Sequence, residues 1–139
     1  MDIRVNTAEK LDSPHILIVD DDPVLLGITA NVIEHLGYQV TTAEGCNEAI
    51  AKIKEHPDKF DAVMTDYALP IMNGIEMSKK IKELSDDINI ILYSGRIDLI
   101  DKKQLDSARL AALARKPCSM DELDSIIKRV VYGKTEISL

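Results

Sequence analysis

Three carboxylates stand where a buried strand is predicted to give way to a loop. Asp20 and Asp21 follow one apolar, β-branched run, and Asp66 follows another, just before a Pro/Asn/Gly turn. Carboxylates gathered at one edge of a protein repel one another unless a positive charge lies between them. A hard divalent cation such as Mg²⁺ is the natural partner, because it prefers a few carboxylate or carbonyl oxygens. These acids therefore predict a Mg²⁺ site.

A hydroxyl and an ammonium group occur at two further strand ends. Ser94 ends a fourth apolar run, and Lys116 follows a fifth. A lysine supplies a mobile positive charge for a phosphoryl oxygen, and a serine supplies a hydrogen-bond donor. A carboxylate that is neutralised by metal and lysine can attack phosphorus and give an aspartyl phosphate. Asp66, which is central among the strands, is the best candidate for this nucleophile.

Each of these residues also has an ordinary structural explanation. Aspartate often ends strands because it favours turns, and Asp22 before Pro23 is more simply the N-cap of a helix. Lys116 before Pro117 could be an exposed lysine at a turn. Four strand ends that carry acid, acid, hydroxyl and ammonium are nevertheless improbable by chance, so we favour a functional site over the separate explanations.

The elements that must position these residues alternate between strand and helix. Continuous apolar runs predict parallel strands buried on both faces, and apolar residues at helical spacing predict the helices between them. This alternation is typical of a single α/β domain of the flavodoxin-like class, with a five-stranded parallel sheet and helices on both faces. Ligands of such sheets bind beyond the carboxyl ends of the strands, so the predicted side chains share one rim. The strands are predicted at 15–19, 38–42, 62–65, 88–93 and 110–114, and the helices at 23–36, 46–56, 75–84, 97–108 and 119–131.

Composition and charge bound the domain and its partners. The chain has 139 residues, of which 45% are hydrophobic, and it is predicted to form one domain over residues 15–132, with a flexible leader at 1–14 and a tail at 133–139. The net charge of −7, with scattered basic residues, argues against nucleic acid or an anionic membrane as a partner of this domain. Cys46 and Cys118 form no metal-binding motif, and no apolar run approaches the about 18 residues that span a bilayer. We therefore expect a cytoplasmic protein.

Four motifs, in this order, resemble the CheY-like receiver domain of two-component response regulators. The resemblance runs from about residue 15 to residue 131. It implies a phosphoacceptor domain of a phosphorelay, which switches conformation to control a partner or an attached kinase or output module. It also implies a monomer or weak dimer that catalyses only its own phosphorylation and slow autodephosphorylation. A hybrid sensor histidine kinase is one expected source. The motifs lie at residues 16–23, 64–74, 92–95 and 116–117.

The resemblance also implies roles for single acidic residues. Asp66 would accept a phosphoryl group from the phosphohistidine of a histidine kinase or a histidine phosphotransfer protein. Asp20, Asp21 and Asp66 would hold Mg²⁺. The backbone carbonyl of Ala68 would be a further ligand of the metal.

The switch positions show a departure from the family pattern. By resemblance, Ser94 and Lys116 would contact the phosphoryl oxygens. The family often has an aromatic residue three positions before the lysine, whose ring turns inward when the hydroxyl moves toward the phosphate, but Leu113 stands here. The usual aromatic readout is therefore missing. Ala68, two residues after Asp66, has no side chain to orient an attacking water, which predicts slow hydrolysis of the acyl phosphate.

Two rival interpretations remain open at this point. A phosphohydrolase of the haloacid-dehalogenase type uses an Asp-x-Asp pair after its first strand, and Asp20 and Asp22 have this spacing. Pro23 and Val24 do not fit that motif, and the chain is short for the core and cap of that fold. The other rival is a receiver-like interaction module that is never phosphorylated. The complete set of acids, hydroxyl and lysine argues against it.

Overall fold

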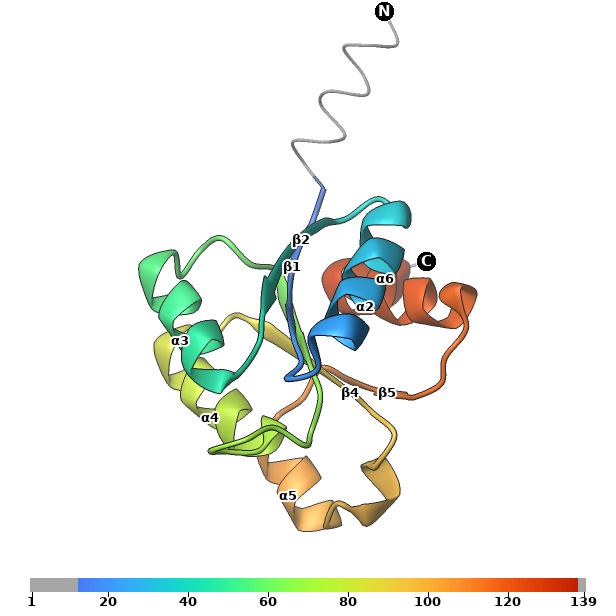
Figure 1. Cartoon of the computed structure of the whole chain (residues 1–139). Coiled ribbons are helices and arrows are strands. Elements are labelled where there is room, and N and C mark those ends of the chain that lie inside the picture. The colour runs from blue at the N-terminus through green and yellow to red at the C-terminus, as the bar shows by residue number, and fades with distance from the viewer. Residues whose placement is uncertain (1–12, 138–139) are drawn as a thin grey trace, which may run out of the picture.

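Five parallel strands form one sheet in the order β2-β1-β3-β4-β5 in the computed structural model, which describes residues 13–137 (Figure 1). Among these residues, no helix is both long enough and apolar enough to cross a lipid bilayer. The strands are β1 (His15–Val19), β2 (Gln39–Ala43), β3 (Ala62–Thr65), β4 (Asn89–Ser94) and β5 (Ala112–Arg115). The helices are α2 (Pro23–His35), α3 (Cys46–Glu55), α4 (Gly74–Leu84), α5 (Lys102–Ser107) and α6 (Met120–Ile137), with a 3₁₀ turn η1 (Ile97–Leu99).

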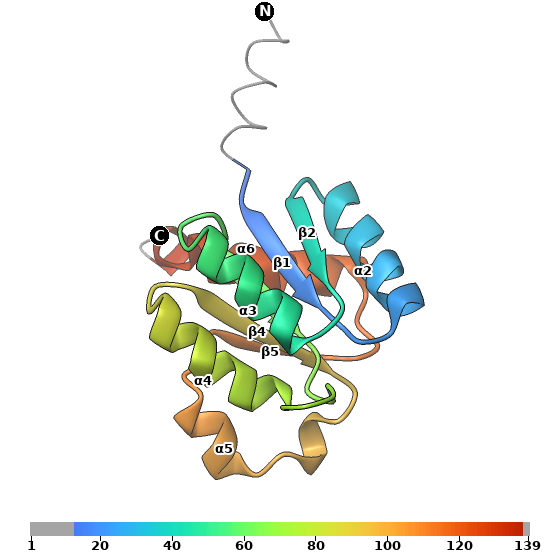
Figure 2. The ribbon, with the colours of Figure 1, turned by 60° about the vertical axis from the view of Figure 1, so that its left-hand side comes forward.

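The sheet is covered on both faces. Helices α2 and α6 lie on one face, and α3 and α4 lie on the other, as the two views show (Figures 1 and 2). Side chains of β1 alternate between the two cores: Leu17 packs with the α3 and α4 side, whereas Ile16 packs with the α2 and α6 side. The predicted α/β fold with a parallel sheet is confirmed.

Several helix starts follow from local sequence. Asp22 caps α2, because its side chain accepts hydrogen bonds from the backbone N–H groups of Val24 and Leu25, and Pro23 occupies the first helical position. Ser119 and Glu122 bond reciprocally at the start of α6. Both capping predictions are confirmed.

The strand order reverses between β1 and β3. Strand β2 lies on one side of β1, and the chain then crosses to β3 on the other side. In open α/β sheets, this switch point leaves a crevice at the carboxyl ends of the two strands. Asp20 follows β1 and Asp66 follows β3, so the two carboxylates flank the crevice.

The region predicted as one helix at 97–108 is two short helical segments. The 3₁₀ turn η1 ends before Ile100, which is extended and buried. The side chain of Asp101 then accepts a hydrogen bond from the Lys103 N–H and starts α5 afresh. The single-helix prediction was wrong because an aspartate inside the apolar pattern acts as an N-cap. Strand β5 also begins at Ala112 rather than residue 110, since Leu110 packs between the cores instead of in the sheet.

Described structure reaches beyond both predicted bounds of the domain. Helix α6 continues through Ile137, so residues 133–137 belong to this helix and not to a tail, because they contain no proline and one interior glycine costs only about 1 kcal/mol. Residues 138–139, and the predicted leader over residues 1–12, lie outside the described residues. Pro14, at the end of the predicted leader, is buried, and its carbonyl accepts the Gln39 N–H.

Candidate functional site

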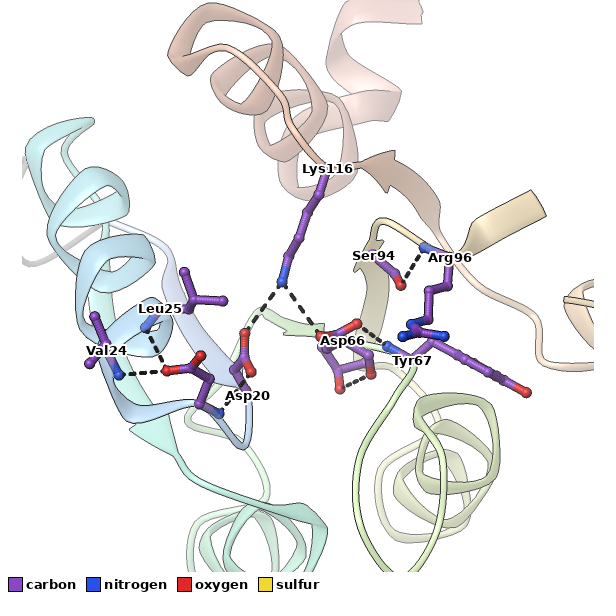
Figure 3. A network of polar contacts seen from close by, with 10 residues as sticks. Asp20, Val24, Leu25, Asp66, Tyr67, Ser94, Arg96 and Lys116 are labelled. Atoms are coloured by element: carbon purple, nitrogen blue, oxygen red, sulfur yellow. Dashed lines mark hydrogen bonds and ion pairs between the residues drawn. The ribbon is translucent and has the colours of Figure 1, made fainter. Parts of the chain in front are cut away.

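Asp66 lies one residue beyond β3, and its backbone still belongs to the ladder. Its N–H donates to the carbonyl of Val19 at 3.2 Å. Its side chain is half-buried, and Oδ1 accepts a hydrogen bond from the backbone N–H of Tyr67 at 2.7 Å (Figure 3). This short local bond sets the orientation of the carboxylate, so that Oδ2 is left for the other residues of the rim.

The turn after Asp66 folds back closely on it. A Cβ atom built on Gly74 would lie 2.3 Å from the backbone oxygen of Asp66, which is closer than real atoms approach. The Gly74 N–H also donates to the carbonyl of Tyr67 at 2.8 Å. Glycine is therefore required at residue 74 by the close approach of two backbone segments.

Asp20 is the most buried acid of the rim, with 5% of its surface exposed. Its Oδ1 accepts a hydrogen bond from the backbone N–H of Asp22 at 3.0 Å. Its Oδ2 faces the ammonium group of Lys116 at 3.3 Å. A buried carboxylate needs such partners, because an unpaired charge away from water is costly.

Lys116 joins the two acids. Its Nζ lies 3.3 Å from Oδ2 of Asp20 and 3.5 Å from Oδ2 of Asp66 (Figure 3). It also lies 5.0 Å from the centroid of the Tyr93 ring. The Lys116 N–H donates to the carbonyl of Ser94, and the peptide bond between Lys116 and Pro117 is cis. One ammonium is thus shared by two carboxylates, which leaves the rim negatively charged.

Ser94 ends β4 on the same rim, and its side chain is fully buried. Its Oγ accepts a hydrogen bond from the backbone N–H of Arg96 at 3.0 Å, close to the Asp66 loop (Figure 3). The structure therefore brings Asp20, Asp66 and Lys116 into contact and places Ser94 at the adjoining strand end.

Three predicted residues lie apart from these contacts. Asp21 and Ala68 are exposed in the loops after β1 and β3. Leu113 lies on β5 with 42% of its surface exposed, and it packs in none of the core clusters. Among the side chains that the structure describes, which end at residue 133, no three His, Cys, Asp or Glu residues gather around one metal-sized point. The ready-made part of the site is therefore the pair of carboxylates that face one cation.

This pair fits a Mg²⁺ ion. Mg²⁺ usually keeps several waters and binds through one or two protein carboxylates together with phosphate oxygens. Asp20 and Asp66 already direct one oxygen each at the same positive charge. The donor set is therefore of the kind that this cation takes, although the structure holds a lysine at that point.

Two aromatic residues of the site escaped the sequence analysis. The Tyr93 ring lies beneath the Lys116 ammonium, and burial, followed by the neighbouring Cys118, raises the pKa of Tyr93. Tyr67 packs against the cluster that includes Ile100 and accepts a hydrogen bond from the Asn73 side chain at 3.4 Å. No sequence signal marks a ring beneath a lysine, although Tyr67 directly follows Asp66 and Tyr93 directly precedes Ser94.

The chain is similar to known signalling domains. The model of the response regulator receiver domain matches residues 16–128. Over 121 residues, the chain is 35% identical to the two-component response regulator ARR14 of Arabidopsis thaliana, a match that covers 86% of this chain and 31% of that protein. Over 118 residues, it is 27% identical to the response regulator receiver protein CpdR of Brucella abortus, covering 85% of this chain and 97% of CpdR.

A solved structure agrees with these sequence matches. The response regulator TrrA from Thermotoga maritima, in complex with Mg²⁺-BeF, superposes with a TM-score of 0.74 and 27% sequence identity. The superposition covers 84% of this chain and 98% of TrrA. The similarity therefore extends over almost all of the TrrA chain in that structure.

Proposed function

Because the chain belongs to the response regulator receiver domain family of two-component and phosphorelay signalling, we propose that Asp66 accepts a phosphoryl group from a phosphohistidine in the presence of Mg²⁺. The observation that carries this proposal is the Lys116 ammonium, which contacts the carboxylates of Asp20 and Asp66 at the reversal of strand order. The proposed donor is a histidine kinase or a histidine phosphotransfer protein, and the cytoplasm is the proposed setting.

The proposed transfer balances without a further reactant. A carboxylate oxygen of Asp66 attacks phosphorus, a new O–P bond forms, and the P–N bond of the phosphohistidine breaks. The electron pair of the broken bond stays on the imidazole nitrogen as the lone pair of neutral histidine, provided that the other ring nitrogen carries the proton. The product is an aspartyl phosphate, and no proton is taken from Asp66 because its carboxylate attacks in ionised form.

Positive charge must offset the incoming phosphoryl group. When bound, Mg²⁺ would neutralise charge on the phosphoryl oxygens and the acids. Asp20, Asp21 and Asp66, with the Ala68 carbonyl, are the groups proposed to hold it. Similarity to TrrA, whose structure contains Mg²⁺-BeF, supports this assignment.

Lys116 and Ser94 are proposed to contact the transferred group. Lys116 already touches Asp66, so its ammonium needs little movement to reach a phosphoryl oxygen on that carboxylate. The Ser94 hydroxyl is buried and its Oγ accepts the Arg96 N–H, so its own O–H is the group proposed to donate to the phosphate. Movement of Ser94 is proposed as the start of the conformational switch, with Leu113 in place of the usual aromatic.

An apolar surface beside the site suits the docking of a donor protein. Val24, Leu25 and Ile28, on the first turns of α2, have 70%, 45% and 55% of their surface exposed. Val24 and Leu25 are also the residues whose N–H groups bond to Asp22, next to Asp20 (Figure 3). We assign this face to docking of the protein that donates the phosphoryl group.

Phosphorylation of two aspartate variants tests the proposal. Asp66→Asn should take up no label from radiolabelled acetyl phosphate with Mg²⁺. Asp61→Asn makes the same change at the other end of β3, and this control should label like the natural protein. Undiminished labelling of Asp66→Asn would refute the assignment. Failure of the natural protein to take up label or to bind Mg²⁺ and beryllofluoride would favour a module that is never phosphorylated.

The phosphohydrolase alternative makes a different prediction. In that mechanism Asp22 would act as a general acid, but its side chain is engaged as the helix cap of α2. Turnover of a generic phosphatase substrate should therefore be negligible, and Asp22→Asn should label like the natural protein. Sustained turnover that Asp22→Asn abolishes would favour the phosphohydrolase.

A further inference from the structure

Tyr93 directly precedes Ser94, but its ring lies on the opposite side of the strand from the Leu92 side chain. Leu92 faces the small core beside α5, whereas Tyr93 packs with the core beneath α2 and α6. On that side the Lys116 ammonium lies 5.0 Å from the ring centroid, within the distance at which a ring face attracts a cation. The ring is therefore a third contact of the ammonium that also touches Asp20 and Asp66.

We propose that Tyr93 is a positioning residue for phosphoryl transfer: the face of its ring holds the Lys116 ammonium between the carboxylates of Asp20 and Asp66. This inference rests on the proposed function of Asp66. The Tyr93 ring itself does not touch the phosphoryl group in this role, and it acts through the lysine.

The two carboxylates alone hold Lys116 loosely. Charge-assisted N–H···O bonds are usually about 2.7–2.9 Å long, whereas Nζ lies 3.3 Å from Asp20 and 3.5 Å from Asp66. A lysine side chain also loses considerable rotamer freedom when it is fixed in one place. A ring contact from a different direction restricts the remaining freedom, so that the ammonium stays at the gap between the acids.

The ring is suited to this task because it is fixed and uncharged. Tyr93 packs with the core that contains Ile91 and Leu123, and Cys118 lies next to it. Burial raises the pKa of Tyr93 above its ordinary value of 10.0, so that the phenol stays neutral at physiological pH. The attraction therefore comes from the ring face and does not need the hydroxyl.

Kinetics of labelling separate the ring from the hydroxyl. Tyr93→Phe keeps the ring and should be phosphorylated by acetyl phosphate like the natural protein, whereas Tyr93→Leu should be slowed about tenfold, the scale of one cation–π contact. Tyr132→Leu, at an exposed site on α6, controls for loss of a tyrosine. In a Lys116→Gln background, Tyr93→Leu should have no further effect, because the group that the ring positions is gone. Equal rates for Tyr93→Leu and the natural protein, or additive effects of the two changes, would overturn the inference.

An NMR measurement tests the contact without phosphorylation. The CH₂ protons next to Nζ of Lys116 should be shifted upfield by the ring, and Lys116→Gln identifies their signal by its loss. The shift should persist in Tyr93→Phe and vanish in Tyr93→Leu. The upfield shift should also be present in Asp66→Asn, which cannot be labelled. The measurement therefore tests the contact between Tyr93 and Lys116 even if the natural protein takes up no label and the proposed function fails. Absence of the upfield signal in the natural protein would overturn the inference without any variant.

Discussion

Strand β3 has an aspartate at each end, and the two differ in their partners. Asp61 precedes the strand at the amino edge of the sheet, and its Oδ2 accepts a hydrogen bond from the His15 N–H at 2.8 Å. Its backbone N–H donates to the His15 carbonyl, and its carbonyl accepts the Asn89 side chain. Asp61 is exposed, and within the described part of the chain its hydrogen bonds join it to uncharged groups, so that its carboxylate ties two strands together.

Asp66, at the carboxyl end of the same strand, lies among charges. It is half-buried, and it shares the Lys116 ammonium with the buried Asp20. Two carboxylates that share one cation retain an excess of negative charge, which attracts a further cation. Identical residues on one strand thus differ in role because one has neutral partners and the other has charged ones.

The close turn after Asp66 predicts the largest effect on stability. Gly74→Ala places a methyl group against the Asp66 carbonyl and should lower the free energy of unfolding by about 1–3 kcal/mol. Gly27→Ala, in the exposed middle of α2 with no atom within 4 Å, should instead raise it by about 0.5–1 kcal/mol. Urea denaturation measures both. Equal effects of the two changes would show that the carboxyl end of β3 is not tightly constrained.

The rim itself could be inferred from the sequence, but the contacts within it could not. The carboxyl ends of parallel strands share one edge, so strand patterns were enough to place Asp20, Asp66 and Lys116 together. The position of the Lys116 ammonium over Tyr93 depends on side-chain rotamers of residues on neighbouring strands. No spacing in the chain encodes such a contact.

The predicted element boundaries were wrong where a single residue adopts a conformation that the surrounding sequence pattern does not indicate. Asp101 restarts a helix inside a periodic apolar pattern. Arg109 adopts a φ of 53°, in the left-handed region, and delays β5, whereas glycine or asparagine would have signalled such a turn. At both places the sequence carried no sufficiently strong local signal of the break.

Mg²⁺ should distinguish the two ends of β3. A ligand that binds only the folded state stabilises it by RT ln(1 + [L]/Kd), about 1.4 kcal/mol at ten times Kd. The melting temperature of the natural protein and of Asp61→Asn should therefore rise with Mg²⁺, whereas Asp20→Asn should respond weakly. An equal rise in all three proteins would place the cation elsewhere.

Without Mg²⁺, the same substitution at the two ends of β3 should have opposite effects. Asp66→Asn keeps an acceptor for the Tyr67 N–H but removes one of the repelling charges, so the free energy of unfolding should rise by about 0.5–1 kcal/mol. Asp61→Asn weakens a charge-assisted bond to the His15 N–H and should lower it by a similar amount. Urea denaturation measures both effects. Effects of the same sign would contradict the distinction between Asp61, which ties two strands together, and Asp66, which lies among repelling charges.

The pH dependence of stability should come from the amino edge, although the effect is the smallest. Nε2 of His15 lies 2.7 Å from the Thr41 hydroxyl, and the ring packs edge-on against Phe60. Burial, and secondarily Lys59, lowers the pKa of His15 below 6.5, while Asp61 opposes this shift. A histidine that resists protonation in the folded state gives full stability above pH 6.5, and this contribution is lost as the pH falls below that value.

Urea denaturation at about pH 7.5 and about pH 5.5 would measure this loss, because these values lie on either side of the ordinary histidine pKa of 6.5. The free energy of unfolding should be lower at the acidic pH, and His15→Gln should reduce the difference, whereas His56→Gln, at an exposed position after α3, should leave it unchanged. The pKa of Glu48 and of Glu122 is also lowered, by backbone N–H donors, but their contributions are lost only as the pH falls below their ordinary value of 4.5. If His15→Gln kept the full pH dependence of the free energy of unfolding, another residue would be the source of that dependence. The amino edge of the sheet would then not account for it.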